Sequence, residues 1–154
     1  MKYKVTLAFA SLMVLTQPTV AEPSINNMQG CQALLDFVDT KLENAPASYG
    51  SSEIATVRQG LSNYNAFIQK EIITPGLIKF SNGDQGKADA LQEQVDVYKS
   101  TLVKSYSEKY PQNRLFMDHV VALNNCTKQA VPTGADLQSL KDAMQAMIAL
   151  TKQS

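Results

Sequence analysis

Apolar residues recur at steps of three and four along most of the chain, and this is the spacing of one face of an α-helix. The first such stripe consists of Met28, Cys31, Leu35, Val38 and Leu42. The second consists of Ile54, Val57, Leu61, Tyr64, Ile68 and Ile72. No stretch of four or more residues alternates convincingly between apolar and polar positions as a half-buried strand does. The pattern therefore predicts an all-α protein.

The second stripe contains two residues that weaken a helix. Gly60 lies within it and costs about 1 kcal/mol relative to alanine. We expect this glycine to allow a neighbouring helix to approach closely. The triplet 74–76 (Thr-Pro-Gly) should break or kink the helix near Ile73, because proline lacks a backbone N–H and its ring clashes with the preceding turn. A short helical segment is expected to follow.

Three further helices are predicted in the second half of the chain. One spans residues 88–109, the next begins near Asn113, and the last begins near Thr133. Short loops between amphipathic helices favour antiparallel neighbours. The predicted fold is a single-domain bundle of four to five antiparallel helices.

The stretch 113–126 (NRLFMDHVVALNNC) is the most apolar run after the N-terminal segment. It contains the only histidine, His119, and one of the two cysteines, Cys126. We expect this helix to be the most buried one, with Met117 and Val121 adding to its apolar side. His119 is expected to be a surface or boundary residue without a catalytic role.

The N-terminus predicts export. Lys2 and Lys4 precede an apolar stretch of 11 residues and a turn-prone segment ending in Ala21. This is typical of a secretory signal peptide spanning residues 1–21, with cleavage before Glu22 and a mature domain spanning 22–154. A membrane anchor is the alternative, but a span needs about 20 apolar residues. We therefore expect a periplasmic or secreted protein.

The two cysteines are expected to form a disulfide, because exported proteins fold in an oxidising compartment. With only Cys31 and Cys126 present, the connectivity within one chain is determined. Both lie on apolar stripes, so we predict that they link the first and fourth helices. Two free thiols or a bridge between chains are the alternatives.

Charge and motifs exclude several classes of function. Cleavage would leave two more acidic than basic residues, which gives no electrostatic footprint for nucleic acid. One histidine and two cysteines exclude a multi-histidine or thiolate-only metal site, and the chain has no C-x-x-C, H-E-x-x-H, G-x-S-x-G or phosphate-binding loop. We predict no catalytic, cofactor or metal site, no nucleic-acid partner and no stable membrane insertion after cleavage.

Helical bundles can also hold haem. The third predicted helix resembles the last helix of the soluble four-helix b-type cytochromes, but Ser107 stands where those proteins carry their ligand histidine. A non-covalent site would have to pair His119 with a methionine such as Met28. These departures weigh against haem.

By elimination we expect an exported, non-catalytic helical protein that binds another protein or a peptide, such as an envelope adaptor, a chaperone or an immunity-type inhibitor. The expected architecture is similar in outline to small periplasmic acid-stress chaperones and to some secretion pilotins, which are helical and contain a disulfide. That likeness extends to the fold alone. The alternative is a carrier of a small ligand or haem, or an enzyme whose pocket leaves no sequence motif.

Overall fold

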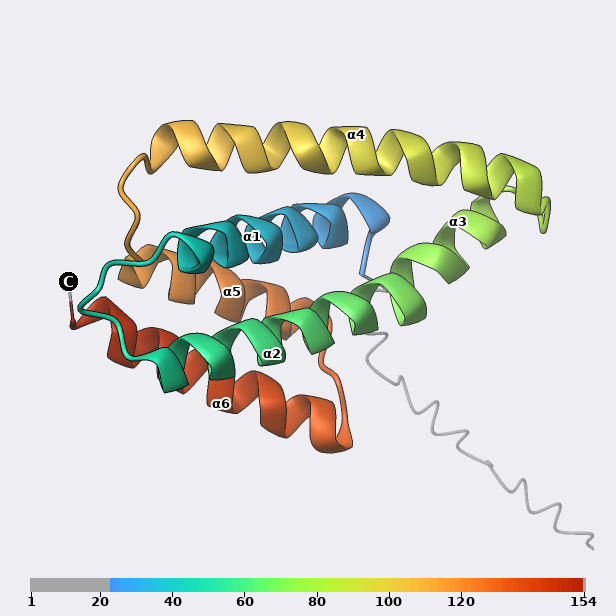
Figure 1. Cartoon of the computed structure of the whole chain (residues 1–154). Coiled ribbons are helices and arrows are strands. Elements are labelled where there is room, and N and C mark those ends of the chain that lie inside the picture. Colours follow the sequence, from blue (N-terminus) through green and yellow to red (C-terminus); the bar gives the residue numbers. More distant parts are fainter. Residues whose placement is uncertain (1–22, 154) are drawn as a thin grey trace, which may run out of the picture.

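The computed structural model describes residues 23–153, so the predicted signal peptide at 1–21 lies outside the described residues. The described chain is helical and contains no strand. In order along the chain the elements are α1 (Ile25–Glu43), α2 (Ser51–Ile68), the π-helix η1 (Gln69–Ile73), α3 (Thr74–Phe80), α4 (Gln85–Lys109), α5 (Met117–Gln129) and α6 (Gly134–Thr151). These helices form one domain, which confirms the predicted all-α class (Figure 1).

Helix α1 is the centre of the fold. It lies between α4 on one side and α2 and α5 on the other, and it contacts all three (Figure 1). More of its positions are buried than in any other described helix, from Met28 to Leu42. Its N-terminus is capped by the Ser24 hydroxyl, which accepts from the Asn27 backbone N–H at 3.2 Å.

The prediction that the 113–126 stretch is the most buried helix is wrong. Helix α5 begins only at Met117 and buries four residues. Met117 and Val121 are exposed instead of thickening the core. An apolar stripe identifies which face of a helix turns inward, but the number of neighbours around the helix decides how many faces are covered.

The second helix does not break at the 74–76 triplet. The path runs from α2 through η1 into α3, and the Thr74 N–H donates to the Gln69 carbonyl five residues earlier. This wider turn places Pro75 at the start of α3, where a missing N–H is tolerated. The chain therefore passes the triplet through a π-helical turn without a break, and such turns are frequent at functional sites.

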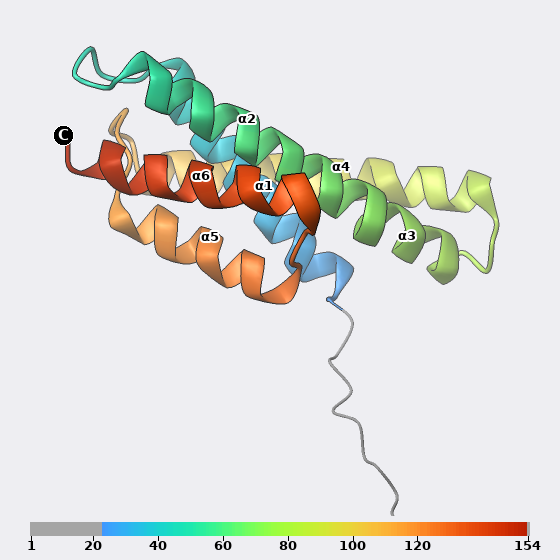
Figure 2. The same ribbon diagram turned by 90° about the horizontal axis from the view of Figure 1, so that it is seen from below.

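Helices α2 and α6 lie side by side in both views (Figures 1 and 2). Gly60 sits at their contact, because a Cβ added there would lie 2.5 Å from both the Ser139 carbonyl oxygen and the Ala143 Cβ. The expectation that this glycine permits a close approach is confirmed. Thr133 precedes α6 without a side-chain capping hydrogen bond.

Helix α4 is the least enclosed long helix. It begins three residues earlier than predicted, at Gln85, where the Asp84 carboxylate accepts from the Lys87 backbone N–H at 3.1 Å. Of its 25 residues only Ala88 and Val95 are buried. It packs against α1 and α3 and leaves its other sides to solvent (Figure 1). Among the described residues, no helix combines the length and the apolar character that crossing a membrane requires.

Candidate functional site

An apolar groove lies where the N-terminal part of α1 meets α3 and α4. Its volume is about 480 Å³. The apolar walls come from three segments of the chain and consist of Ile25, Leu77, Phe80, Leu91, Val95 and Tyr98. Asn26, Gln29 and Gln94 complete the lining, so none of the nine lining residues carries a charge.

Two large apolar side chains of this groove are open to solvent. Phe80, the last residue of α3, is 74% exposed, and Tyr98 on α4 is 50% exposed. The other large apolar side chains exposed in the described chain do not line the groove, and they are Val97, Met117, Val121 and Val131. Single exposed apolar residues are common on protein surfaces and need no explanation. Phe80 and Tyr98 differ because they expose apolar surface together within one groove.

The polar residues of the groove have unused hydrogen-bonding capacity. Gln29 is only 4% exposed, and its side chain forms no hydrogen bond with any described residue. Asn26 and Gln94 are exposed, and their side chains also lack a partner among residues 23–153. The low exposure of Gln29 is that of the whole residue, and its amide atoms are not among the fully buried polar atoms without a partner, so they keep contact with solvent.

One turn further along α1 a chain of amide hydrogen bonds begins at Gln32, whose buried Oε1 has no partner among the described residues. The Gln32 Nε2 donates to Gln69 Oε1 at 3.2 Å, and the Gln69 Nε2 donates to Gln92 Oε1 at 2.8 Å and to the Thr74 hydroxyl at 2.9 Å. This ladder ties α1, the π-helix and α4 together. It fixes the positions of α1 and α4, which form two walls of the groove.

A second groove, of about 450 Å³, lies between α1 and α2 and is polar. Its charged side chains are used in ion pairs. The Arg58 Nε lies 2.7 Å from Asp39 Oδ1, and Asp36 Oδ2 lies 3.3 Å from the Lys99 Nζ. Because these charges already compensate one another, the groove offers less to a charged ligand than its composition suggests.

His119 is not at the surface, so that prediction is wrong. It is 2% exposed, and its ring makes T-shaped contacts with three aromatic rings. The distances between ring centroids are 5.2 Å to Phe37, 4.7 Å to Tyr110 and 5.5 Å to Phe116. Its Nδ1 accepts from the Phe116 backbone N–H at 3.3 Å. Its buried Nε2 has no partner among the described residues.

The surroundings of His119 favour the neutral ring. Burial lowers its pKa to about 4, the charge of Asp118 opposes this shift, and the charge of Lys41 adds to it. The sequence did contain a signal for this burial, because His119 precedes Leu123 and Cys126 at helical steps of four and three. The sequence-based prediction instead placed His119 at the surface because histidine is polar.

Lys41 is another buried polar residue at the same end of α1. It is 6% exposed, its Nζ donates to the Tyr110 carbonyl at 2.5 Å, and it lies 5.1 Å from the centre of the Phe37 ring. Desolvation lowers the pKa of its ammonium group. Lys41 thereby anchors the C-terminal end of α4 to α1.

The structure does not bring Met28 and His119 together. His119 packs on Phe37, and Met28 lies nine residues earlier on the same helix, a separation of about 13 Å along the helix axis. Both cannot ligate one haem iron. In the described part of the chain, no group of three or more histidine, cysteine, aspartate or glutamate residues is placed to hold a metal ion.

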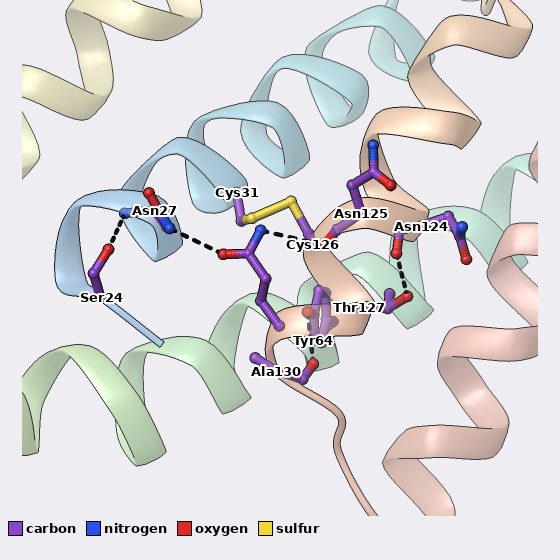
Figure 3. Close-up of a disulfide and its surroundings, with 10 residues drawn as sticks. Ser24, Asn27, Cys31, Tyr64, Asn124, Asn125, Cys126, Thr127 and Ala130 are labelled. Carbon is purple, nitrogen blue, oxygen red and sulfur yellow. Dashed lines mark hydrogen bonds between the residues drawn. A yellow bond between two sulfur atoms is a disulfide. The ribbon is translucent and has the colours of Figure 1, made fainter. Parts of the chain in front are cut away.

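The predicted disulfide between Cys31 and Cys126 is confirmed. Its sulfur atoms are 2.10 Å apart and the Cα atoms are 5.7 Å apart, so it joins α1 to α5 (Figure 3). Two hydrogen bonds lie nearby: the Asn27 Nδ2 on α1 donates to Gln129 Oε1 on α5 at 3.1 Å, and the Tyr64 hydroxyl on α2 donates to the Ala130 carbonyl just after α5 at 2.8 Å (Figure 3).

No protein-family model, curated protein sequence or solved structure matches this chain.

Proposed function

We propose that this protein is exported and binds another protein or a peptide, without catalysing a reaction, through the groove between α1, α3 and α4. The observation that carries the proposal is the exposure of Phe80 and Tyr98 within one uncharged groove. Covering a side chain such as Phe80 contributes about 1.5–3 kcal/mol, so a partner that fills the groove gains a substantial part of a binding free energy.

Two features support the proposed location outside the cytoplasm. The Cys31–Cys126 disulfide fits an oxidising compartment. The first 21 residues have the composition of a signal peptide, with cleavage before Glu22. A periplasmic or secreted adaptor, chaperone or immunity-type inhibitor would use the groove in the same way, by covering its apolar walls with a segment of the partner.

The proposal is tested by capture with matched variants. The oxidised protein spanning 22–154 is immobilised and exposed to an envelope extract, and the bound proteins are identified by mass spectrometry. Phe80→Ser combined with Tyr98→Ser should abolish specific capture. Val131→Ser is the control, because Val131 is 58% exposed and does not line the groove. Capture that survives the groove substitutions would refute the proposed site.

A carrier of a small apolar ligand is the second candidate. The groove volume of about 480 Å³ falls within the range of small-molecule sites, which is about 300–1,000 Å³. Native mass spectrometry of the protein purified from its source distinguishes the two, because a carrier retains a ligand of low mass that Phe80→Ser with Tyr98→Ser releases.

A further inference from the structure

The linker that joins α4 to α5 (residues 110–116) lies against the C-terminal end of α1 (Figure 1). It covers apolar surface there, since Phe37 on α1 is 0% exposed and the linker's own Leu115 is 1% exposed. Three hydrogen bonds hold the linker in place: Lys41 Nζ to the Tyr110 carbonyl at 2.5 Å, the Leu115 N–H to the Tyr49 hydroxyl at 2.7 Å, and the Phe116 N–H to His119 Nδ1 at 3.3 Å.

The third of these hydrogen bonds exists only while His119 is neutral. Its Nδ1 accepts from the Phe116 N–H, so the single proton of the neutral ring lies on Nε2. An imidazolium ring carries a proton on both nitrogens, and the added one would lie on Nδ1, facing another donor. Phe116 is the N-cap of α5 and has no polar side chain of its own. Protonation of His119 therefore removes the hydrogen bond that joins the linker to the first turn of α5.

The charges around His119 also oppose its protonation. Each of the three rings that it contacts lies beside a cation, with centroid distances of 5.1 Å from Lys41 to Phe37, 5.1 Å from Lys109 to Tyr110 and 4.6 Å from Arg114 to Phe116. The neighbouring carboxylate of Asp118 acts in the other direction. The nearby phenol groups, of Tyr49, Tyr106 and Tyr110, are uncharged in acid. A positive charge in the first turn of α5 would in addition oppose the helix dipole.

We infer that His119 is an acid-operated switch, whose protonation releases the Phe116 N–H, separates residues 110–119 from α1 and uncovers Phe37 and Leu115. Helix α5 stays attached to the domain, because Cys126 further along it is bonded to Cys31 on α1. The uncovered side chains form an apolar surface that is open in acid and closed at neutral pH. This surface lies apart from the groove between α1, α3 and α4, so the inference goes beyond the proposed function.

Amide hydrogen exchange, followed by NMR on the oxidised protein spanning 22–154, provides the test. The opening constants of the Leu115, Phe116 and His119 amides are measured at pH 7 and pH 3.5, each corrected for the intrinsic exchange rate. The pKa of His119 is about 4 in the closed segment and 6.5 when the ring is free, so these constants should rise about a hundredfold between the two pH values. His119 is the only histidine in the sequence, and its ring signal reports the protonation directly.

Two variants assign the response to His119. His119→Gln removes the titratable ring and keeps an acceptor, because glutamine at the third position of a helix can cap the preceding backbone N–H. Its opening constants should differ by no more than about twofold between the two pH values. Asp118→Asn is the matched control, since it removes the adjacent carboxyl group, which also gains a proton in acid, and leaves His119 in place. Its acid response should persist.

Each alternative result overturns the inference. If His119→Gln responds to acid as strongly as the native protein, or if Asp118→Asn loses the response, another group drives the opening. If the amides of α2 have the same opening constant at pH 3.5 as those of residues 115–119, acid unfolds the whole domain and there is no local switch; we expect the constants of 115–119 to be about tenfold higher or more. The native protein tests the inference without any variant, because a His119 ring that stays neutral at pH 3.5 would refute it.

Discussion

His119 meets the ring of Phe37 edge-on, at 5.2 Å between centroids and an interplanar angle of 88°. This contact holds a titratable ring inside the core, where burial lowers the pKa of His119 from 6.5 to about 4. The unfolded chain takes up the same proton at the ordinary pKa. Between these two values the unfolded state binds more protons, so the free energy of unfolding must fall as the pH falls.

We therefore expect acid to destabilise the fold through His119. The loss should set in below about pH 6.5, reach about 3 kcal/mol by pH 4, and level off below that, where the ring is protonated in both states. Urea unfolding at pH 7 and pH 4.5 measures it. His119→Phe is the control, because it keeps an aromatic ring in contact with Phe37 and removes the titratable group. An equal pH dependence in both proteins would contradict the assignment.

Removing the disulfide should destabilise the protein strongly. The bridge closes a loop whose ends are 95 residues apart in sequence, and it restrains the unfolded chain. Cys31→Ser combined with Cys126→Ser should lower the free energy of unfolding by about 2–5 kcal/mol and the Tm by roughly 10 °C or more. Circular dichroism follows the melting. Thiol titration of the denatured, unreduced protein should find no free thiol, and a finding of two would overturn the bridge.

Two helical glycines should respond to alanine in opposite directions. At Gly60 the added Cβ would lie 2.5 Å from Ala143 Cβ and from the Ser139 carbonyl oxygen, so α6 must move away. We expect Gly60→Ala to cost about 1–3 kcal/mol. A Cβ added at Gly30 would meet no neighbouring atom within 4 Å. We therefore expect Gly30→Ala to raise the free energy of unfolding by about 0.5–1 kcal/mol. Chemical denaturation of the two variants measures both signs.

Phe80 should be dispensable for folding. At 74% exposure it contributes little to the core, and Phe80→Ser should change the free energy of unfolding by no more than about 0.5 kcal/mol. Leu77→Ser is the matched comparison on the same helix. Leu77 is 5% exposed, so placing a hydroxyl there should destabilise the protein by roughly 2 kcal/mol or more. A large loss of stability in Phe80→Ser would show that the residue has a structural role.

If the protein is exported as predicted, its N-terminal segment should be cleaved off. The chain recovered from its source should begin at or near Glu22 and be found outside the cytoplasm, because residues 1–21 have the pattern of a cleaved signal. Intact-mass measurement decides the point. A native chain that retains Met1 to Ala21 would refute the predicted compartment.

The helices were accessible from the sequence because helix formation leaves a local signature. Steps of three and four between Met28, Cys31 and Leu35 need no knowledge of the rest of the chain, and the same spacing identified α2. The disulfide followed from a count, since two cysteines allow one bridge within the chain. The break expected at Pro75 does not occur, because a π-helical turn that the sequence did not predict carries the helical path into α3.

Burial was decided only by the tertiary structure. Both His119 and Lys41 are polar, and the helical spacing of His119 with Leu123 indicates a shared face without deciding that the face is enclosed. They are covered because α4, α5 and the Tyr110 segment converge on one end of α1. The reverse holds at Phe80, which is apolar and yet 74% exposed at the end of α3.

The sequence by itself determined the helical class, most of the helix positions and the covalent link between the first and fourth predicted helices. Only the tertiary structure decided that α1 is the central helix and that Gln29 and Phe80 share one groove with Tyr98. The physical reason is the range of the interactions. Periodicity, proline and cysteine pairing act on short stretches or single pairs, whereas a groove needs three segments, separated by tens of residues, to be packed at a particular distance and angle.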